Sequence, residues 1–436
     1  MNETCAGRWA GRAPGLLTGL LTLLLTVGLT GCGWTPPGRV LVIGIDGATM
    51  RLAGRLLEQG RLPNLARIAE AGASGELKSF RPLFSPRIWT TIATGKTPAK
   101  HGIAGFTFRD DDDEQHLYLS VHRESAALWN IVSDAGGMVG VVNWWNTYPP
   151  EIVRGVLVSD HAKPQRVAEL SKLTGVDAEE DGGSPVFPPQ WRARVAAAYD
   201  ATDALTDFAN PFEGDHGLAR WMRAGVLAKR FYEDEAAVRV ALEIEREIRP
   251  DLMMVFLPGI DRVSHHLWGT LVPEELYPTA LRPTPSQREA GANALRGYYA
   301  YTDALIGRLL EPYGPDDLVM VVSDHGFEPG LHLGTLTGIH DSTMAEDGVL
   351  FMSGPGVSAG TDTKGVTVND ITPTVLAWLG LPLGEDMDGT VVPFLEHEPI
   401  ELIPTHDVRA IEYLDTVPSG SEAEILEQLR DLGYIE

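Results

Sequence analysis

The run Arg39-Val-Leu-Val-Ile-Gly-Ile-Asp46 is an unbroken apolar segment of strand length that ends on a carboxylate. Such runs are typical of strands that are buried on both faces of a parallel sheet. The same pattern recurs in three later segments, at 138–143, 251–257 and 317–323. Two of the intervening stretches, 62–72 and 125–135, place apolar residues at intervals of three and four, which indicates helices. This alternation predicts an α/β fold, with a mostly parallel sheet and helices on both of its faces.

The composition excludes several classes of protein. The chain has 436 residues, of which 44% are hydrophobic, and 60 acidic residues against 35 basic ones give a formal net charge of -25. The apolar fraction is that of a globular protein, so disordered and fibrous classes are excluded. Phosphate backbones are bound by basic stripes and none is visible, so we expect no nucleic-acid partner.

The strand and helix rhythm runs through residues 39–400, which we expect to form one catalytic domain with insertions. Residues at about 162–235 interrupt the rhythm with an acidic loop and a proline-rich segment, and they are predicted to cap the sheet edge. A smaller insertion is expected at 267–290. The tail, 401–436, holds the capping-box pattern Ser421-Glu-Ala-Glu424, which predicts a short helix.

The first residues read as an export signal, because Arg8 and Arg12 precede a short apolar run at 15–30. The following Leu29-Thr30-Gly31-Cys32 resembles the bacterial lipobox, in which the signal is cut before the cysteine and that cysteine is lipidated. We therefore expect a signal peptide at 1–31, a tether at 32–38, and anchoring through Cys32 to the bacterial cell envelope, on its extracytoplasmic or periplasmic face. An ordinary signal peptide or an uncleaved anchor is the alternative.

Polar residues follow three of the predicted strands, at the edge where α/β sheets bind ligands. They are Asp46, Asp261 and the pair Asp324-His325. Carboxylate oxygens combined with imidazole nitrogens suit zinc or manganese. His265 lies four residues after Asp261, so one helical turn brings both side chains to the same side. The next residue, His266, is the weaker alternative because it is rotated away from Asp261.

One short motif occurs twice. Val158-Ser-Asp-His161 copies Val322-Ser-Asp-His325, and both follow apolar strands, so spacing alone does not separate them. The second copy is followed by Gly326, which permits a tight turn away from the strand. The acidic run from Asp110 to Glu114 is expected to be a solvated loop rather than a metal site.

A nucleophile is suggested by the segment that runs from Phe84 to Gly95. Ser85 at the N-cap, Pro86 at the first helical position and Gly95 at the end describe one short helix. A hydroxyl near the free amide groups of a helix N-terminus is well placed to attack and hold a phosphate. A metal ion bound to its oxygen would ionise it near neutral pH. A capped helix without catalytic function is the plain alternative.

At this point the sequence resembles the alkaline phosphatase superfamily, and within it the type I phosphodiesterase/nucleotide pyrophosphatase branch. The resemblance covers most of residues 39–390, and its motifs occur in the family's order. These motifs are Ile43-Gly-Ile-Asp46-Gly47, the 85–95 segment followed by Thr97-Pro-Ala-Lys-His-Gly-Ile103, Asp261-x-x-x-His265, Ser323-Asp-His-Gly326, Gly338-Ile-His340 and Asp370-Ile-Thr-Pro-Thr374.

The resemblance implies two divalent metal ions, zinc by family analogy, with manganese as the alternative. One site would hold Asp261, His265 and His340, with His332 as the runner-up for the last of these. The other would hold Asp46, Asp324, His325 and Ser85. It thereby selects Asp324-His325 over the copy at 160–161. Ser85 would attack phosphorus and form a covalent phosphoseryl intermediate, and His101 would be structural.

Two departures from the family pattern bear on specificity. The nucleotide pyrophosphatases usually have Thr as the nucleophile and, shortly after His-Gly-Ile, an Asn that binds a phosphate oxygen; here these places hold Ser85 and Phe106. Asn143 or Arg87 is the expected substitute for that contact. A formylglycine sulfatase is disfavoured, because its Cys or Ser stands two residues before Pro and four before Arg.

We therefore expect a hydrolase that cleaves a phosphodiester, phosphomonoester or phosphonate, on a small molecule or on a lipid or glycan head group. Two alternatives stay open: a transferase of phospho-head-groups that uses the same core, and a binding lipoprotein that has lost turnover.

Overall fold

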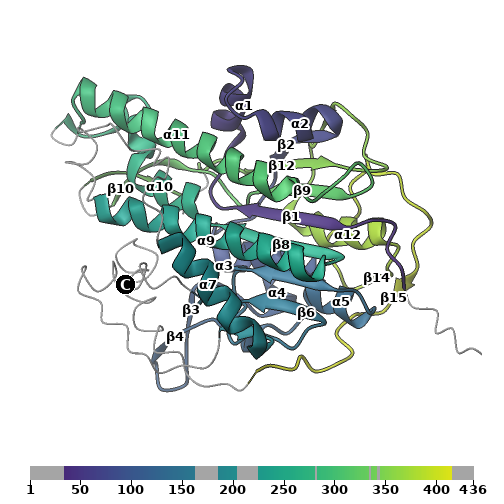
Figure 1. The fold of residues 1–436 in the computed structure, drawn as a ribbon. Coiled ribbons are helices and arrows are strands. Elements are labelled where there is room, and N and C mark those ends of the chain that lie inside the picture. The colour runs from purple at the N-terminus through teal and green to yellow at the C-terminus, as the bar shows by residue number, and fades with distance from the viewer. Residues whose placement is uncertain are drawn as a thin grey trace, which may run out of the picture. The chain divides into compact units, whose positions relative to one another are not determined.

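A nine-stranded sheet forms the centre of the computed structural model, which describes residues 34–162, 185–203, 224–279, 282–332, 335–340 and 344–414 (Figure 1). The strand order is β13-β2-β12-β9-β1-β8-β5-β6-β7. The five strands from β9 to β6 are mutually parallel, and β12 and β7 join them antiparallel. The prediction of a mostly parallel α/β sheet is thus confirmed. The strands are β1 (Val40–Ile45), β2 (Ala73–Leu77), β5 (Val139–Val142), β6 (Gly155–Val158), β7 (Val186–Phe187), β8 (Leu252–Leu257), β9 (Leu318–Val322), β12 (Gly348–Ser353) and β13 (Thr361–Asp362).

Strand β1 lies in the middle of the sheet, and its side chains alternate between two separate cores. Leu41, Ile43 and Ile45 belong to one apolar cluster, while Val40 and Val42 belong to the other. All six residues of the strand are buried, which explains why its sequence is apolar without interruption. This strand is the element on which both helical layers are built.

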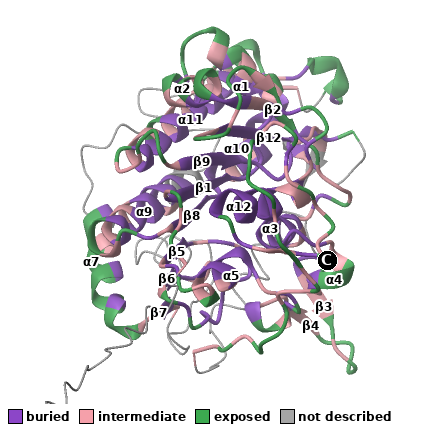
Figure 2. Ribbon diagram, turned by 90° about the vertical axis from the view of Figure 1, so that its right-hand side faces the viewer, coloured by how far each residue is buried: buried purple, intermediate pink, exposed green. Residues whose placement is uncertain are grey.

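Helices cover both faces of the sheet (Figure 2). The first face is covered by α1 (Met50–Glu58), α2 (Pro63–Ala71), α7 (Arg192–Asp203), α9 (Ala224–Ile248), α10 (Gly259–Leu267) and α11 (Pro285–Leu310). The second is covered by α3 (Ser85–Thr94), α5 (Leu128–Asp134) and α12 (Ile371–Leu379). The shorter elements are α4 (Pro98–His101) and three two-stranded sheets, β3 (Thr107–Arg109) with β4 (Gln115–Leu117), β10 (Glu328–His332) with β11 (Thr335–Ile339), and β14 (Leu383–Gly384) with β15 (Leu402–Ile403).

The sequence did not reveal the antiparallel side of the sheet. Strand β12 pairs antiparallel with both β9 and β2. Strand β2 follows α2 directly and alternates buried with more accessible residues, so it lacks the continuous apolar run that marks the parallel strands. The position of β2 in the sheet depends on pairing with residues far along the chain, and the local sequence pattern does not indicate such pairing.

Parts of the predicted domain organisation lie outside the described residues, namely 1–33, the centre of the cap insertion at 163–184 and 204–223, and the C-terminal helix within 415–436. The structure does describe one residue of the predicted tether and one of the predicted tail, and both contact the catalytic domain. Trp34, in the stretch predicted as a tether, donates its indole N–H to the Leu379 carbonyl at 3.1 Å. Tyr413, in the predicted tail, forms a β-bridge with Glu151. Within the described part of the chain, no helix has the length and apolarity needed to cross a membrane.

Candidate active site

The carboxyl ends of β1, β8 and β9 bring three aspartates together. Asp46 directly follows β1, Asp324 lies two residues beyond β9, and Asp261 lies in the first turn of α10, which follows β8. All three are buried. Gly47 makes the approach possible, because it has a φ of +73° and a Cβ there would lie 2.8 Å from the Asp261 Cα atom.

Three histidines complete the cluster. His265 Nε2 lies 3.3 Å from Asp261 Oδ1, as the four-residue spacing on α10 predicts. His340, which follows β11, places its Nε2 atom 3.8 Å from the same oxygen. His325 Nε2 lies 3.4 Å from both Asp46 Oδ1 and Asp324 Oδ2. The structure thus brings together the six aspartates and histidines among the seven predicted metal ligands, of which Ser85 is the seventh.

The backbone sets the tautomer of each imidazole. The Nδ1 atoms of His265, His325 and His340 lie 3.0, 3.1 and 2.9 Å from the carbonyl oxygens of Gly338, Gly326 and Leu83. A carbonyl oxygen only accepts, so each Nδ1 carries the proton and donates it. Each Nε2 lone pair is then directed at the carboxylates, which is the arrangement of a metal-ligating histidine.

Several buried oxygens of the cluster have no hydrogen-bond partner among the described residues. They are Asp46 Oδ1, Asp261 Oδ1 and Asp324 Oδ2, one from each carboxylate. Buried carboxylate oxygens without a partner are costly unless a cation compensates them. The ligand atoms form two overlapping groups within 4.8 Å, Asp261 with His265 and His340, and Asp46 with Asp261 and His325. The donor set therefore fits divalent metal ions, with Asp261 between the two groups.

The pKa directions of Asp46, Asp324 and His340 agree with a cluster that is short of positive charge, whereas the neighbouring histidines, His265 first, hold the pKa of Asp261 below its usual value despite its burial. Burial, and then the nearby Asp324 and Asp261, raise the pKa of Asp46 well above its usual value. Burial also raises the pKa of Asp324. Burial, followed by His325 and His265, lowers the pKa of His340 well below its usual value, so the ring stays neutral and able to ligate. A cation at this place favours the ionised carboxylates and the neutral imidazoles.

Helix α3 presents Ser85 to this cluster. The predicted N-cap is wrong by one residue: the cap is Phe84, Ser85 is the first helical residue, and no side chain caps the helix. The hydroxyl is therefore not engaged in capping, and its oxygen lies 3.3 Å from His325 Nε2. Gly95 ends the helix in a left-handed conformation, as predicted.

Other predicted residues lie elsewhere. His266 and the 160–161 pair are outside both metal-ligand groups. The side chain of His332 is outside the described residues. The guanidinium of Arg87 lies over the Phe80 ring at 5.0 Å. Asp110 accepts backbone N–H groups from Asp112 and Glu114 at 3.0 and 2.8 Å, which makes the acidic run a turn.

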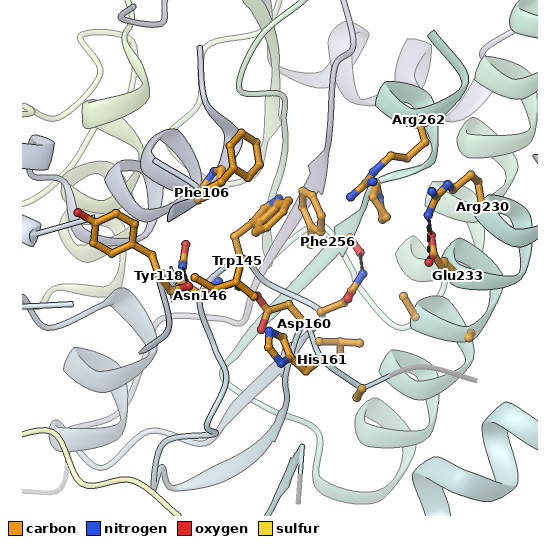
Figure 3. A pocket seen from close by; sticks show the side chains of 18 of the residues that line it. Phe106, Tyr118, Trp145, Asn146, Asp160, His161, Arg230, Glu233, Phe256 and Arg262 are labelled. Carbon is orange, nitrogen blue, oxygen red and sulfur yellow. Dashed lines mark hydrogen bonds and ion pairs between the residues drawn. The ribbon is translucent and has the colours of Figure 1, made fainter. Parts of the chain in front are cut away.

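A cavity of about 100 Å³ is lined by Pro86 and Arg262, the residues that follow Ser85 and Asp261 in the sequence, and Figure 3 shows most of its side chains. The predicted Asn143 lines this cavity, but Arg87 does not. The sequence did not predict the other residues that line the cavity, among them Tyr118, Trp145, Asp160, Arg230, Phe256 and Arg262. Arg262 directly follows Asp261, and the tandem Trp144-Trp145 directly follows the end of a predicted strand. Their positions in the sequence could therefore have indicated that they lie near the site.

A mostly parallel sheet that holds a buried Asp/His cluster beside a serine at a helix N-terminus defines the alkaline phosphatase superfamily, a class of metal-dependent hydrolases. Within it the chain belongs to the type I phosphodiesterase / nucleotide pyrophosphatase family, whose pattern it matches over residues 40–370. It is an enzyme that hydrolyses phosphoric ester bonds, as the sequence predicted. A search of curated sequences found no match.

Solved structures share the fold. A 2-O GAG sulfatase is similar with 11% identity and a TM-score of 0.52, over 84% of this chain and 76% of the sulfatase. The alkaline phosphatase PafA is similar with 13% identity and a TM-score of 0.50, over 83% of this chain and 99% of that enzyme. Human ectonucleotide pyrophosphatase / phosphodiesterase 5 has 12% identity and a TM-score of 0.49, over 81% and 97%. At such identities the likeness concerns the fold alone.

Proposed function

We propose that the protein hydrolyses phosphate esters with Ser85 as the nucleophile and with two divalent metal ions held by the Asp/His cluster. The observation that carries this proposal is the contact of 3.3 Å between Ser85 Oγ and His325 Nε2, because it places the serine hydroxyl within the Asp/His cluster.

The chain's own groups suggest how the metals are held. Asp261, His265 and His340 would hold one ion, and Asp46, Asp324, His325 and the Ser85 oxygen the other. The mixed oxygen and nitrogen donors suit zinc, with manganese as the alternative. When bound, the ions would lower the pKa of the serine hydroxyl and offset the charge that develops on the phosphoryl oxygens.

The reaction follows from these positions. Ser85 Oγ loses its proton and forms a bond to phosphorus, while the ester bond opposite breaks and the released alkoxide takes up a proton. The cavity beside Pro86 receives the leaving group. The positive end of the α3 dipole, at Ser85, would face the phosphoryl group and help to stabilise its negative charge. Water then attacks the phosphoserine, which releases phosphate and restores the hydroxyl.

Metal analysis and an activated substrate test the proposal. Purified protein is expected to contain close to two zinc or manganese ions per chain by mass spectrometry and to hydrolyse an aryl phosphate ester. Ser85→Ala is expected to keep its metal and lose at least about 10³-fold in kcat. A metal-free wild-type protein, or an active Ser85→Ala variant, would contradict the mechanism. Exclusive transfer of the phosphoryl group to an added alcohol would favour the transferase alternative.

We also propose that Cys32 anchors the protein to a bacterial membrane, on the lipobox pattern of residues 29–32. Metabolic labelling with palmitate is expected to mark the wild type but not Cys32→Ser. Labelling of both proteins would refute the assignment.

A further inference from the structure

The parallel strands give the sheet two opposite edges. The five strands from β9 to β6 run in one direction, so their carboxyl ends form one edge, the carboxyl edge, and their amino ends form the other, the amino edge. The three aspartates of the Asp/His cluster follow strands at the carboxyl edge. Strand β1 has six residues, and at about 3.3 Å per residue it separates the two edges by about 20 Å.

The segment that precedes β1 is packed against the amino edge. A Cβ on Gly137, two residues before β5, would lie 2.6 Å from the Cζ3 atom of Trp34, and the Trp34 indole donates to the carbonyl of Leu379, the last residue of α12. A Cβ on Gly38 would lie 2.1 Å from the carbonyl oxygen of Asp316, two residues before β9. Figure 1 shows this purple segment at the opposite end of β1 from α10.

The predicted lipid attachment site is close to this packed segment in the sequence. Cys32 precedes Trp34 by two residues, and two residues of chain span at most about 7 Å. A tether of seven residues without contacts would let the body turn freely on the membrane, but the packing of Trp34 removes most of that freedom. A lipid on Cys32 inserts into the bilayer while the folded body stays outside it, so the surface around Trp34 must face the membrane.

We propose that the membrane lies against the amino edge, so that the active site, on the opposite edge, acts on phosphate esters dissolved in the surrounding water and not on lipids of the membrane that carries the protein. The inference rests on the proposed anchor and on the proposed active site. It selects a water-soluble ester among the substrates that the sequence left open.

The dimensions of a bilayer support this choice of substrate. The polar layer on each side of the hydrocarbon core is only about 5–8 Å deep, so the phosphate groups of the host membrane lie near Trp34 and not near Asp46. To reach the carboxyl edge, a lipid would have to leave the bilayer, and every CH₂ group of its chains opposes that step. The edge that carries the Asp/His cluster stays open to water.

Two single labels test the orientation of the lipidated protein. When Cys32 carries a lipid and Cys5 has been removed with the signal peptide, the mature protein has no free thiol, so an introduced cysteine is labelled alone. Asp316→Cys places a fluorophore on an exposed residue of the amino edge. Met344→Cys places one on a residue that is 79% exposed and lies just before β12, whose first residues lie beside the carboxyl end of β9.

The two labelled proteins are reconstituted into vesicles of phosphatidylethanolamine and phosphatidylglycerol that carry a short-range quencher on their head groups. We expect at least about 2-fold quenching of the label at position 316 and less than about 1.2-fold quenching at position 344. Trp34→Ala frees the tether and should reduce this difference. The matched control is Trp191→Ala, which removes an indole from the other core and should leave the difference unchanged.

A pair of substrates tests the functional consequence. One is 4-nitrophenyl phosphate, and the other is the same aryl phosphate attached through its ring to a lipid in the vesicles that carry the protein. Anchoring ordinarily raises the effective concentration of a substrate in the same membrane. We nevertheless expect the anchored wild type to hydrolyse the lipid-linked ester at least about 10-fold more slowly than unanchored Cys32→Ser, at soluble-ester rates that agree within about 2-fold.

Equal quenching at the two positions, stronger quenching at position 344, or faster hydrolysis of the lipid-linked ester by the anchored wild type would overturn the inference. Failure of the proposed anchor looks different, since the wild type would then take up the thiol label at Cys32 and would not bind vesicles. Failure of the proposed active site looks different again, because neither the wild type nor Cys32→Ser would hydrolyse the soluble ester.

Discussion

The two Ser-Asp-His copies follow parallel strands of one sheet, yet they do different things. At the end of β9, Asp324 and His325 are fully buried and lie in the metal cluster. At the end of β6, Asp160 accepts the backbone N–H groups of Asn146 and Thr147 at 2.9 and 3.3 Å. The ring of His161 stacks on Tyr148, with centroids 4.5 Å apart.

The neighbouring strands explain the difference. Strand β9 lies next to β1, so its end meets Asp46, whereas β6 is separated from β1 by β5 and β8. The same residue types therefore belong to the Asp/His cluster in one place and hold a loop in the other. That loop carries Trp145 between Asn143 and Asn146, both at positive φ, a conformation that asparagine tolerates better than most residues. The same four-residue motif therefore belongs to the cluster only where the order of the strands brings the required neighbours to it.

The largest contrast is expected from Asp324→Asn against Asp160→Asn. Asp324→Asn removes a buried carboxylate from the cluster, so we expect a loss of at least about 10³-fold in kcat/KM for an aryl phosphate and a lower metal content. Steady-state kinetics and metal analysis measure both effects. If Asp160→Asn loses metal to the same extent, the functional division between the copies is wrong.

The stability of the loop gives the second contrast. Asp160→Asn weakens two backbone hydrogen bonds to a carboxylate, so we expect it to lower the free energy of unfolding by about 1–3 kcal/mol at unchanged metal content. It should also lower kcat/KM a few-fold, because Trp145 is held less firmly. Urea unfolding measures the first effect, and an unchanged midpoint would show that Asp160 does not clamp the loop.

The pH dependence of that stability gives a third contrast. Burial raises the pKa of Asp160 to about 6, above the value of about 4 expected in the unfolded chain. The folded state then binds the extra proton between these values, so this contribution to stability is full below about pH 4 and is lost as the pH rises through 6. Asp160→Asn should lack this part of the slope. Parallel urea midpoints for the two proteins from pH 4 to 7 would reject the effect.

The smallest effect is expected at the second histidine of the pair. His161→Ala removes a stacked ring and is expected to cost about 0.5–1.5 kcal/mol of stability with little change in metal content. His325→Ala, by contrast, should lose activity and metal together. Thermal unfolding and metal analysis of the two variants make the comparison, and metal loss in His161→Ala would contradict it.

The three aspartates and His265 could be predicted from the residues themselves, whereas the choice of Asp324-His325 over the 160–161 copy and the role of His340 came from the family resemblance. Asp46, Asp261 and Asp324 each follow an apolar strand, and parallel strands bring such ends to one edge. His265 lies four residues after Asp261, so a single helical turn is enough to bring the two side chains together. The sequence did not predict the cavity, because Trp145 and Arg262 meet only after β5 and β8 have paired. It also placed Ser85 one residue outside its helix, since the Ser-Pro pair is typical of a cap when read alone.

The central position of β1 has a consequence for the order in which the enzyme is made. Val40 is aligned with Leu252 on one side and Leu318 on the other, so the first strand to be synthesised receives its neighbours only late in translation. Until then its apolar faces and both edges lack their native partners, which makes the nascent chain prone to association. The Asp/His cluster is likewise complete only once His340 has been added, after most of the chain has been synthesised.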